Sequence, residues 1–220
     1  MNIYNNKKTL FFKLKRNSLK EWQQYTRHKF VISLGEGTLQ LSCFKDYLLQ
    51  DYIFLQKFIK ILSLSAYQAK TLEDRNRSVD FIIGIKHELS LHASYCKKFN
   101  ISKSKLLKTK EKKQNKSYTD YVLSVGVKKS NLELFVALSP CIIGYGEIGH
   151  NLSKLENWKK SKYASWIKMY SSKEYQKIAN ENIKYLDKLF TKNKKSSYKS
   201  LVKIFKKASK LEANFWEMCI

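Results

Sequence analysis

Three reactive side chains, those of Asp51, Cys141 and Glu212, are each spaced so that a helix would place them among apolar residues. Burying a carboxylate costs several kcal/mol unless it is paired, so an acidic residue in such a position is informative. Aromatic surroundings raise the pKa of a carboxyl group towards neutrality, as a general acid or base requires, and Phe205 and Phe215 share the predicted face of Glu212. A cysteine becomes nucleophilic where a cation or a hydrogen-bond donor stabilises its thiolate.

Each of these positions also has a purely structural interpretation. Asp51 would then form a buried pair with a Lys or Tyr of another helix, and Glu212 would belong to a buried ion pair. Cys141 would be a small hydrophobic residue on a face shared with Leu138 and Tyr145. Spacing alone leaves both interpretations open.

Pro140 and several tyrosines favour a site. A proline inside a helical run frees a backbone carbonyl group and kinks the helix, and kinks often mark sites. Tyr145 lies one turn after Cys141 and places a phenol on the same face, while Tyr118 follows a lysine-rich stretch and Tyr170 closes a further aromatic face. Together these residues predict a pocket for a flat aromatic ligand.

Metal and nucleotide sites are not indicated. His87-Glu88 followed by His92 resembles a zinc-binding pattern, but a spacing of i+5 turns the second imidazole about 140° around a helix. The sequence contains neither a GxxxxGK[ST] nor a GxGxxG pattern. We therefore expect no metal, no cofactor and no nucleotide of that type.

Helices must position these residues, because helical periodicity runs along nearly the whole chain, which has only 7 Gly and 1 Pro. The predicted helices span residues 9–25, 42–69, 75–99, 119–127, 132–152, 162–170, 172–190 and 196–218. Breaks are expected at residues 34–38 and 102–117, the second a lysine-rich loop, and Ser102, Ser172 and Ser196 are expected to cap helices. The pattern predicts an all-α protein with a single domain over residues 1–220.

The chain carries 43 Lys and Arg against 18 Asp and Glu, a formal net charge of +25. Most of these cations are Lys, which recognises phosphate less specifically than Arg does. We therefore interpret the charge as a solvated surface and do not expect a nucleic-acid partner. No run of about 18 apolar residues indicates a membrane span. Four widely spaced cysteines without a secretory segment predict reduced thiols in the cytoplasm.

The sequence resembles the thiaminase II (TenA) family. Residues 44–55 resemble the signature FxxYxxQDxxYL, with Phe54 at its last Tyr, and further blocks before and after them lie in the family's order along nearly the whole chain. Those blocks are His28-Lys29-Phe30, residues 35–39, Tyr118-Thr119, residues 138–141 with Tyr145 and Glu147, residues 163–170 and residues 212–218. The ordered set, rather than any single block, carries the resemblance.

The resemblance implies a haem-oxygenase-like multi-helical bundle, assembled as a homotetramer, without metal or haem. It also implies an aminopyrimidine aminohydrolase that acts in thiamin salvage. The substrate would be 4-amino-5-aminomethyl-2-methylpyrimidine, hydrolysed to the hydroxymethylpyrimidine and ammonia. Thiamin would be a slower substrate, cleaved to the pyrimidine and the thiazole alcohol.

Roles follow from the resemblance position by position. Cys141 matches the nucleophile that adds to the pyrimidine, Glu212 the acid/base, and Asp51 the carboxylate that hydrogen-bonds the aminopyrimidine edge. The substrate-binding aromatic residues would be Phe54, Tyr118, Tyr145, Tyr170 and Phe215. Phe54 stands where many members have Tyr, which keeps an aromatic face but removes a hydroxyl group, and turnover or substrate preference is expected to differ accordingly.

Two other classes of function remain as alternatives. One is an oxidase on the same bundle, whose di-iron form would need several converging His and Glu residues, although no His follows His150. The other is a basic nucleic-acid-binding or regulatory helical protein, for which the sequence has no recognition motif. Salt-dependent DNA binding without pyrimidine hydrolysis would favour the second alternative.

Overall fold

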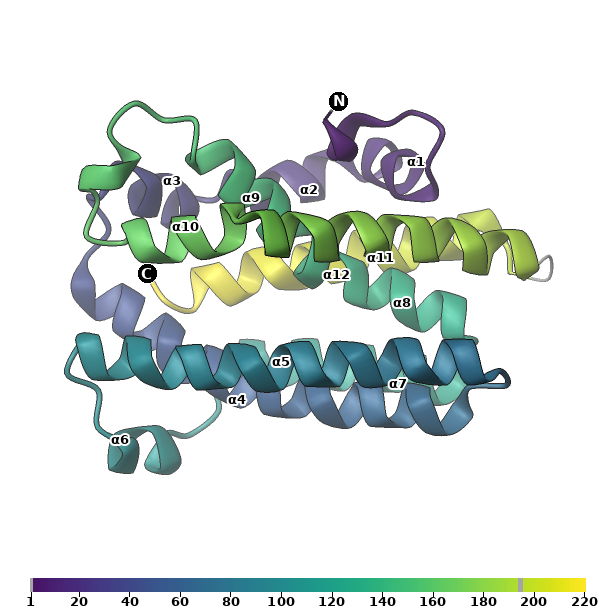
Figure 1. Cartoon of the computed structure of the whole chain (residues 1–220), viewed down its shortest axis with the longest axis horizontal. Helices are drawn as coiled ribbons and strands as arrows, with labels where there is room; N and C mark the ends of the chain where they lie inside the picture. The colour runs from purple at the N-terminus through teal and green to yellow at the C-terminus, as the bar shows by residue number, and fades with distance from the viewer. Residues whose placement is uncertain (1, 194–195) are drawn as a thin grey trace. The chain divides into compact units, whose positions relative to one another are not determined.

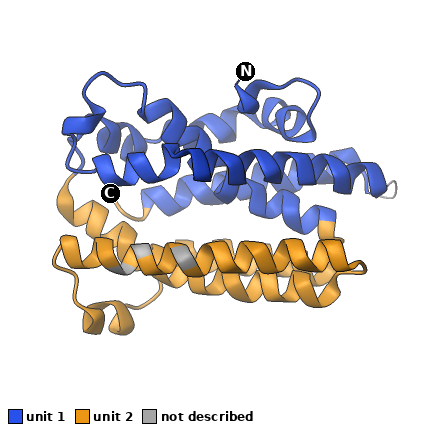
Figure 2. Ribbon diagram, viewed as in Figure 1, with its two compact units in different colours: residues 1–39, 132–217 blue, residues 40–131, 218–220 orange. Residues whose placement is uncertain are grey.

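The structure, a computed structural model, describes residues 2–193 and 196–220, without the side chains of residues 87, 91 and 93. The described chain is helical and contains no strand, which confirms the all-α prediction (Figure 1). It forms two compact units, the first made of residues 1–39 and 132–217 and the second of residues 40–131 and 218–220 (Figure 2). The single-domain organisation stays a prediction.

Unit 1 is built around the C-terminal helix. That helix, α12, packs against α1, α2 and η2, while α11 packs against α1, α10 and η2, and α10 packs against α9. The elements are η1 (Ile3–Asn5), α1 (Leu10–Asn17), α2 (Leu19–Thr26), α3 (Lys29–Glu36), α8 (Asn131–Ser139, whose first residue belongs to unit 2), η2 (Pro140–Gly144), α9 (Tyr145–Leu152), η3 (Trp158–Lys160), α10 (Ala164–Ser171), α11 (Lys173–Lys192) and α12 (Tyr198–Glu217).

Buried aromatic rings and one buried ion pair hold the helices of unit 1 together. The rings of Trp22 on α2 and Phe205 on α12 stack with centroids 5.3 Å apart. Lys15 on α1 donates to both carboxylate oxygens of Glu147 on α9, at 2.9 and 3.0 Å, and both side chains are largely buried. The pair therefore fixes α1 against the helix that begins at Tyr145.

Unit 2 consists of α4 (Leu41–Gln68), α5 (Leu72–Lys98), α6 (Lys103–Lys108) and α7 (Lys113–Lys128), with residues 218–220. Helices α4 and α5 run side by side as a long hairpin, and α7 packs against α4 (Figure 1). Thr71 begins α5, because its hydroxyl group accepts from the backbone N–H of Asp74. Because α4 packs against both α5 and α7, the core of unit 2 lies along α4, the helix that carries Asp51 and Phe54.

Three predicted boundaries were wrong, each for a local reason. The helix predicted over residues 9–25 is two helices, because Ser18 has non-helical angles of φ −130° and ψ 29°. The break predicted at residues 34–38 begins only at Gly37, whose φ of +78° ends α3 in the left-handed conformation. The predicted loop at residues 102–117 contains α6, which is capped by Ser102, and the start of α7.

Helix α3 was not predicted, and the helix predicted over residues 132–152 is divided into α8, η2 and α9. Helices α4, α5, α10, α11 and α12 were predicted with small shifts at their ends. Ser172 caps α11 as predicted, since its hydroxyl group accepts from the backbone N–H of Tyr175. Helix α12 begins at Tyr198 instead of Ser196. Residues 131–152 are long and apolar enough to cross a membrane by composition, but 89% of the most apolar stretch is buried inside the structure, as in a core helix.

Candidate active site

Cys141 lies in η2, a π-helical turn between α8 and α9. Pro140 has no N–H group, and the carbonyl group of Val136 accepts from the hydroxyl group of Ser139 at 2.8 Å. Cys141 itself is partly exposed, whereas its α-helical spacing predicted a buried position. The wider π turn shifts the register after Pro140, and π turns of this kind occur frequently at functional sites.

Two tyrosines hold the backbone on either side of Cys141. The hydroxyl group of Tyr25 donates to the carbonyl oxygen of Pro140 at 3.3 Å, and that of Tyr175 donates to the carbonyl oxygen of Ile142 at 3.2 Å. Sequence reasoning missed both, because each lies on a helix distant in the sequence. The two contacts fix the peptide groups that aim the thiol.

An aromatic cluster lies on the helices that follow the thiol. The rings of Tyr145 and Tyr170, both predicted as site residues, lie 5.0 Å apart, and Tyr145 lies 5.4 Å from Trp216. Gln176 ties the two helices together by donating to the carbonyl oxygens of Gly146 at 2.9 Å and Tyr170 at 2.8 Å. Unit 1 therefore brings these two phenols together on a fixed support.

Glu212 and Phe215 lie on α12, which packs against the π turn. Glu212 is 1% exposed, which confirms its predicted burial, and Phe215 is also buried. Their neighbour Trp216 stacks on Phe30 with centroids 4.7 Å apart. This stacking anchors the segment of α12 that presents the carboxylate.

Three further predicted residues lie in unit 2. Asp51 and Phe54 are buried on α4, and Tyr118 is buried on α7. The rings of Phe54 and Tyr118 lie 5.3 Å apart. The carboxylate of Asp51 contacts Nε2 of His92 on α5 at 3.4 Å, so the described partner is a histidine and not the Lys or Tyr considered from the sequence.

Gln50, the residue before Asp51, fixes the start of α7. Its Oε1 accepts from the backbone N–H of Lys112 at 2.9 Å, and its Nε2 donates to the carbonyl oxygen of Lys110 at 3.0 Å. Asn115 on α7 donates to the backbone carbonyl of Gln50 at 2.8 Å. Gln50 therefore satisfies backbone groups that a helix end leaves open, and it places the helix that carries Tyr118.

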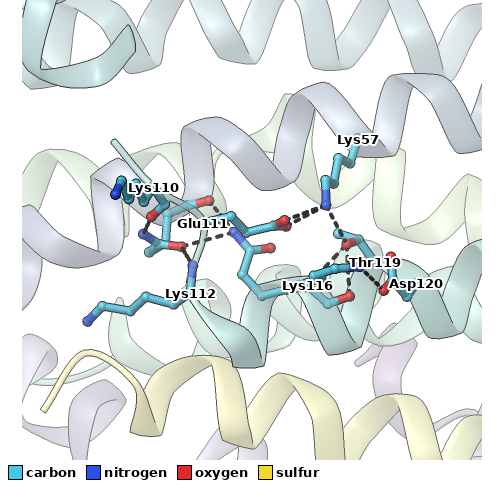
Figure 3. A network of polar contacts seen from close by, with 9 residues as sticks. Lys57, Lys110, Glu111, Lys112, Lys116, Thr119 and Asp120 are labelled. Carbon is cyan, nitrogen blue, oxygen red and sulfur yellow. Dashed lines mark hydrogen bonds and ion pairs between the residues drawn. The ribbon is translucent and has the colours of Figure 1, made fainter. Parts of the chain in front are cut away.

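A charged contact reinforces this junction (Figure 3). Lys57 on α4 donates to both carboxylate oxygens of Glu111, at 2.7 and 2.6 Å, and reaches the hydroxyl oxygen of Thr119 at 3.4 Å. Lys116 and Asp120 form a second, exposed pair on α7. The signature around Gln50 was visible in the sequence, but its contacts join residues about 60 positions apart and could not be read from spacing.

The side chain of His87 lies outside the described residues, so the interpretation of the His87–His92 spacing stays a prediction. Across the residues whose side chains are described, no group of three or more His, Cys, Asp and Glu side chains could hold a metal ion.

These elements and side chains define a helical-bundle protein whose reactive groups are a thiol at a π turn and buried carboxylates, with aromatic rings in both units. Residues 16–220 match the model of the TENA/THI-4/PQQC family, and the chain belongs to that family. The resemblance read from the sequence is thereby confirmed.

Three similar proteins illustrate the relationship. The chain is 34% identical over 209 residues to an aminopyrimidine aminohydrolase of Helicobacter pylori, covering 93% of this chain and 95% of that protein. It is 30% identical to an aminopyrimidine aminohydrolase of Halalkalibacterium halodurans, covering 90% and 89% of the two chains. A crystal structure described as a TenA family transcription regulator from a Silicibacter species has a TM-score of 0.89 and 31% identity, covering 96% of each chain.

Proposed function

We propose that this chain is an aminopyrimidine aminohydrolase. Its preferred substrate would be 4-amino-5-aminomethyl-2-methylpyrimidine, and thiamin would be a slower substrate. The net reaction exchanges the amine on the exocyclic methylene for the hydroxyl group of water, and it releases ammonia. Family membership and the two similar aminohydrolases named above support this proposal.

The reaction proceeds through two easier steps in place of one difficult displacement. The Cys141 thiolate adds to a ring carbon while a ring nitrogen is protonated, and the exocyclic C–N bond breaks as Glu212 gives a proton to the departing ammonia. Glu212 then takes a proton from water, which adds to the exocyclic methylene. The C–S bond then breaks, the ring nitrogen gives up the proton it took, and the aromatic ring and the thiolate are restored.

Substrate recognition is divided among the other proposed residues. In unit 2, Asp51 accepts hydrogen bonds from the N–H groups of the aminopyrimidine, and the rings of Phe54 and Tyr118 offer apolar faces. In unit 1, Tyr145 and Tyr170 supply phenols, and Phe215 supplies a stacking ring; these six residues are all buried.

One observation carries the chemical part of the proposal. Within unit 1, a partly exposed thiol stands on a π turn whose flanking carbonyls are held by Tyr25 and Tyr175, and the helix packed against that turn bears the buried carboxylate of Glu212. A fixed nucleophile and an acid/base group on neighbouring elements are the components that this hydrolysis requires.

Steady-state assays of three variants test the proposal. Cys141→Ser lowers kcat/KM for the aminomethylpyrimidine by about 10³-fold or more, because a hydroxyl group is a poor nucleophile at neutral pH. Glu212→Gln lowers it by about 10²–10⁴-fold through loss of proton transfer. The control is Cys43→Ser, which changes another partly exposed cysteine and leaves the rate unchanged. Equal turnover by wild type and Cys141→Ser contradicts the covalent mechanism.

The proposal includes assembly and location. We expect a homotetramer in the cytoplasm, with all four cysteines as reduced thiols. Light scattering of the purified chain gives the assembly directly, and a monomer at working concentration contradicts it.

A regulator that binds nucleic acid is the second candidate, because the similar Silicibacter structure is described as a transcription regulator and this chain carries a net charge of +25. Binding to duplex DNA with a steep salt dependence, together with no hydrolysis of pyrimidine, would favour it.

A further inference from the structure

His92 is a buried titratable residue of unit 2 to which the proposed function gives no role. It lies on α5 and is 5% exposed. Its Nε2 lies 3.4 Å from Oδ2 of Asp51 on α4, its Nδ1 lies 3.5 Å from Sγ of Cys96 one turn further along α5, and the ring of Tyr52 flanks it at 6.1 Å. A buried Asp–His–Cys chain therefore ends at the carboxylate proposed to recognise the substrate.

The charge of His92 follows from its surroundings. Burial lowers the pKa of an imidazole, because a low dielectric disfavours the cation. The contacts with Asp51 and Cys96 outweigh burial and raise the pKa of His92 above its ordinary value of 6.5. We therefore expect the ring to be an imidazolium at neutral pH, with N–H groups on both nitrogens.

An imidazolium in this position constrains Asp51 in two ways. Its Nε2 lies 3.4 Å from Oδ2, and the attraction between opposite charges favours the rotation of the carboxylate that brings Oδ2 to this side. It also supplies the opposite charge without which a buried carboxylate is costly. The remaining lone pairs of the carboxylate are acceptor sites for the N–H groups of a ligand.

We propose that His92 is a positioning residue, which holds Asp51 as an oriented, charged acceptor for the N–H edge of an aminopyrimidine. This role rests on the proposed function of Asp51. Residues that stand behind a binding group and fix its orientation contribute about 10- to 100-fold in comparable metal sites, so a measurable loss of affinity is expected when the imidazole is removed.

Calorimetric binding of the hydroxymethylpyrimidine product to the full chain tests the role. His92→Leu removes both N–H groups and weakens binding by about tenfold or more. His92→Gln keeps an N–H donor and restores part of that loss. Asp51→Asn also weakens binding, and His92→Leu adds little to it, because His92 acts only through Asp51.

The matched control is Ile85→Ala, which removes a buried side chain two turns earlier on α5 and keeps the affinity of wild type. The proposal is overturned if His92→Leu binds as tightly as wild type, if its loss adds in full to that of Asp51→Asn, or if Ile85→Ala weakens binding equally. Failure of the proposed function looks different, because wild type then neither binds nor hydrolyses the pyrimidine.

Nitrogen NMR of the His92 imidazole adds a readout that needs no ligand and no leucine variant. Near neutral pH we expect protons on both nitrogens in wild type and a neutral ring in Asp51→Asn. A neutral His92 in wild type overturns the proposal.

Discussion

At the scale of single residues, a few buried or half-buried polar groups contact the reactive side chains of each unit or the backbone beside them. In unit 1, Tyr25 and Tyr175 hold the carbonyl groups on either side of Cys141. In unit 2, His92 contacts Asp51. A buried polar group is costly when its partner is removed, so each of these contacts is a place where one substitution has a distinct effect.

Tyr175→Phe removes the hydroxyl group that donates to Ile142 and leaves the ring in place. Losing this hydrogen bond costs about 1 kcal/mol, and the same loss in the transition state lowers kcat about fivefold. Tyr198→Phe is the matched control, because the hydroxyl group of Tyr198 accepts from Asn17 on the exposed surface, away from the π turn. Steady-state kinetics of both variants decide the matter, and equal rates for Tyr175→Phe and wild type would show that the contact does not aim the thiol.

The raised pKa of His92 predicts a pH-dependent contribution to stability. A histidine whose pKa is higher in the folded state than in the unfolded state stabilises the fold fully below its unfolded pKa of 6.5, and this stabilisation is lost as the pH rises through the folded value. The difference in unfolding free energy between wild type and His92→Gln is therefore greatest near pH 6 and shrinks in the alkaline range. Urea unfolding from about pH 6 to pH 10 measures it, and a difference that grows with pH contradicts a buried imidazolium.

The sequence alone indicated some of these residues and not others. Burial of Asp51 and Glu212 followed from their spacing and was confirmed. The predicted burial of Cys141 was wrong, because the spacing argument assumes an α-helix and the chain forms a π turn there. His92 was noticed only as half of a metal-like pattern, since its contact with Asp51 joins two helices and leaves no local signal.

At the scale of elements, the start of α7 depends on α4. Residues 109–112, which precede α7, have little apolar content. The helix begins where Gln50 and Lys57 of α4 contact residues 110–112. The position of Tyr118 along α7 is therefore set by a buried amide on a different helix.

Gln50→Ala tests this dependence. It removes two side-chain hydrogen bonds to the backbone and leaves those backbone groups without their partner, which costs about 1–3 kcal/mol. We expect a lower melting temperature and a raised KM, because Tyr118 and its contact with Phe54 shift. Gln56→Ala, on the exposed side of the same helix, is the control and changes neither quantity. A wild-type KM for Gln50→Ala would show that the contacts of Gln50 with residues 110–112 do not affect substrate binding.

The helices themselves were largely predictable, and their ends were not. Long amphipathic stretches such as α4 and α11 appear in the periodicity, because a buried stripe repeats along them. The break at Ser18 and the short helix α6 depend on a single residue's backbone angles and on one buried side chain, Leu106. Periodicity over a long window does not detect features of that size.

At the scale of the whole molecule, the net charge of +25 predicts sensitivity to salt. Like charges repel within a folded chain, and raising the ionic strength from 0.01 to 0.15 M shortens the screening length from about 30 Å to about 8 Å. We expect the melting temperature to rise by about 2–4 °C for each kcal/mol of repulsion removed. A melting temperature that falls with added NaCl would mean that favourable ion pairs outweigh the repulsion.

The central claim is that this chain replaces the amine of an aminomethylpyrimidine with water by means of Cys141. Reaction of the purified chain in ¹⁸O-labelled water measures both halves of that exchange. We predict one labelled oxygen in the hydroxymethylpyrimidine and one ammonia for each product molecule, with both signals lost in Cys141→Ser and retained in Cys43→Ser. Absence of product with wild type, or undiminished product with Cys141→Ser, contradicts the claim.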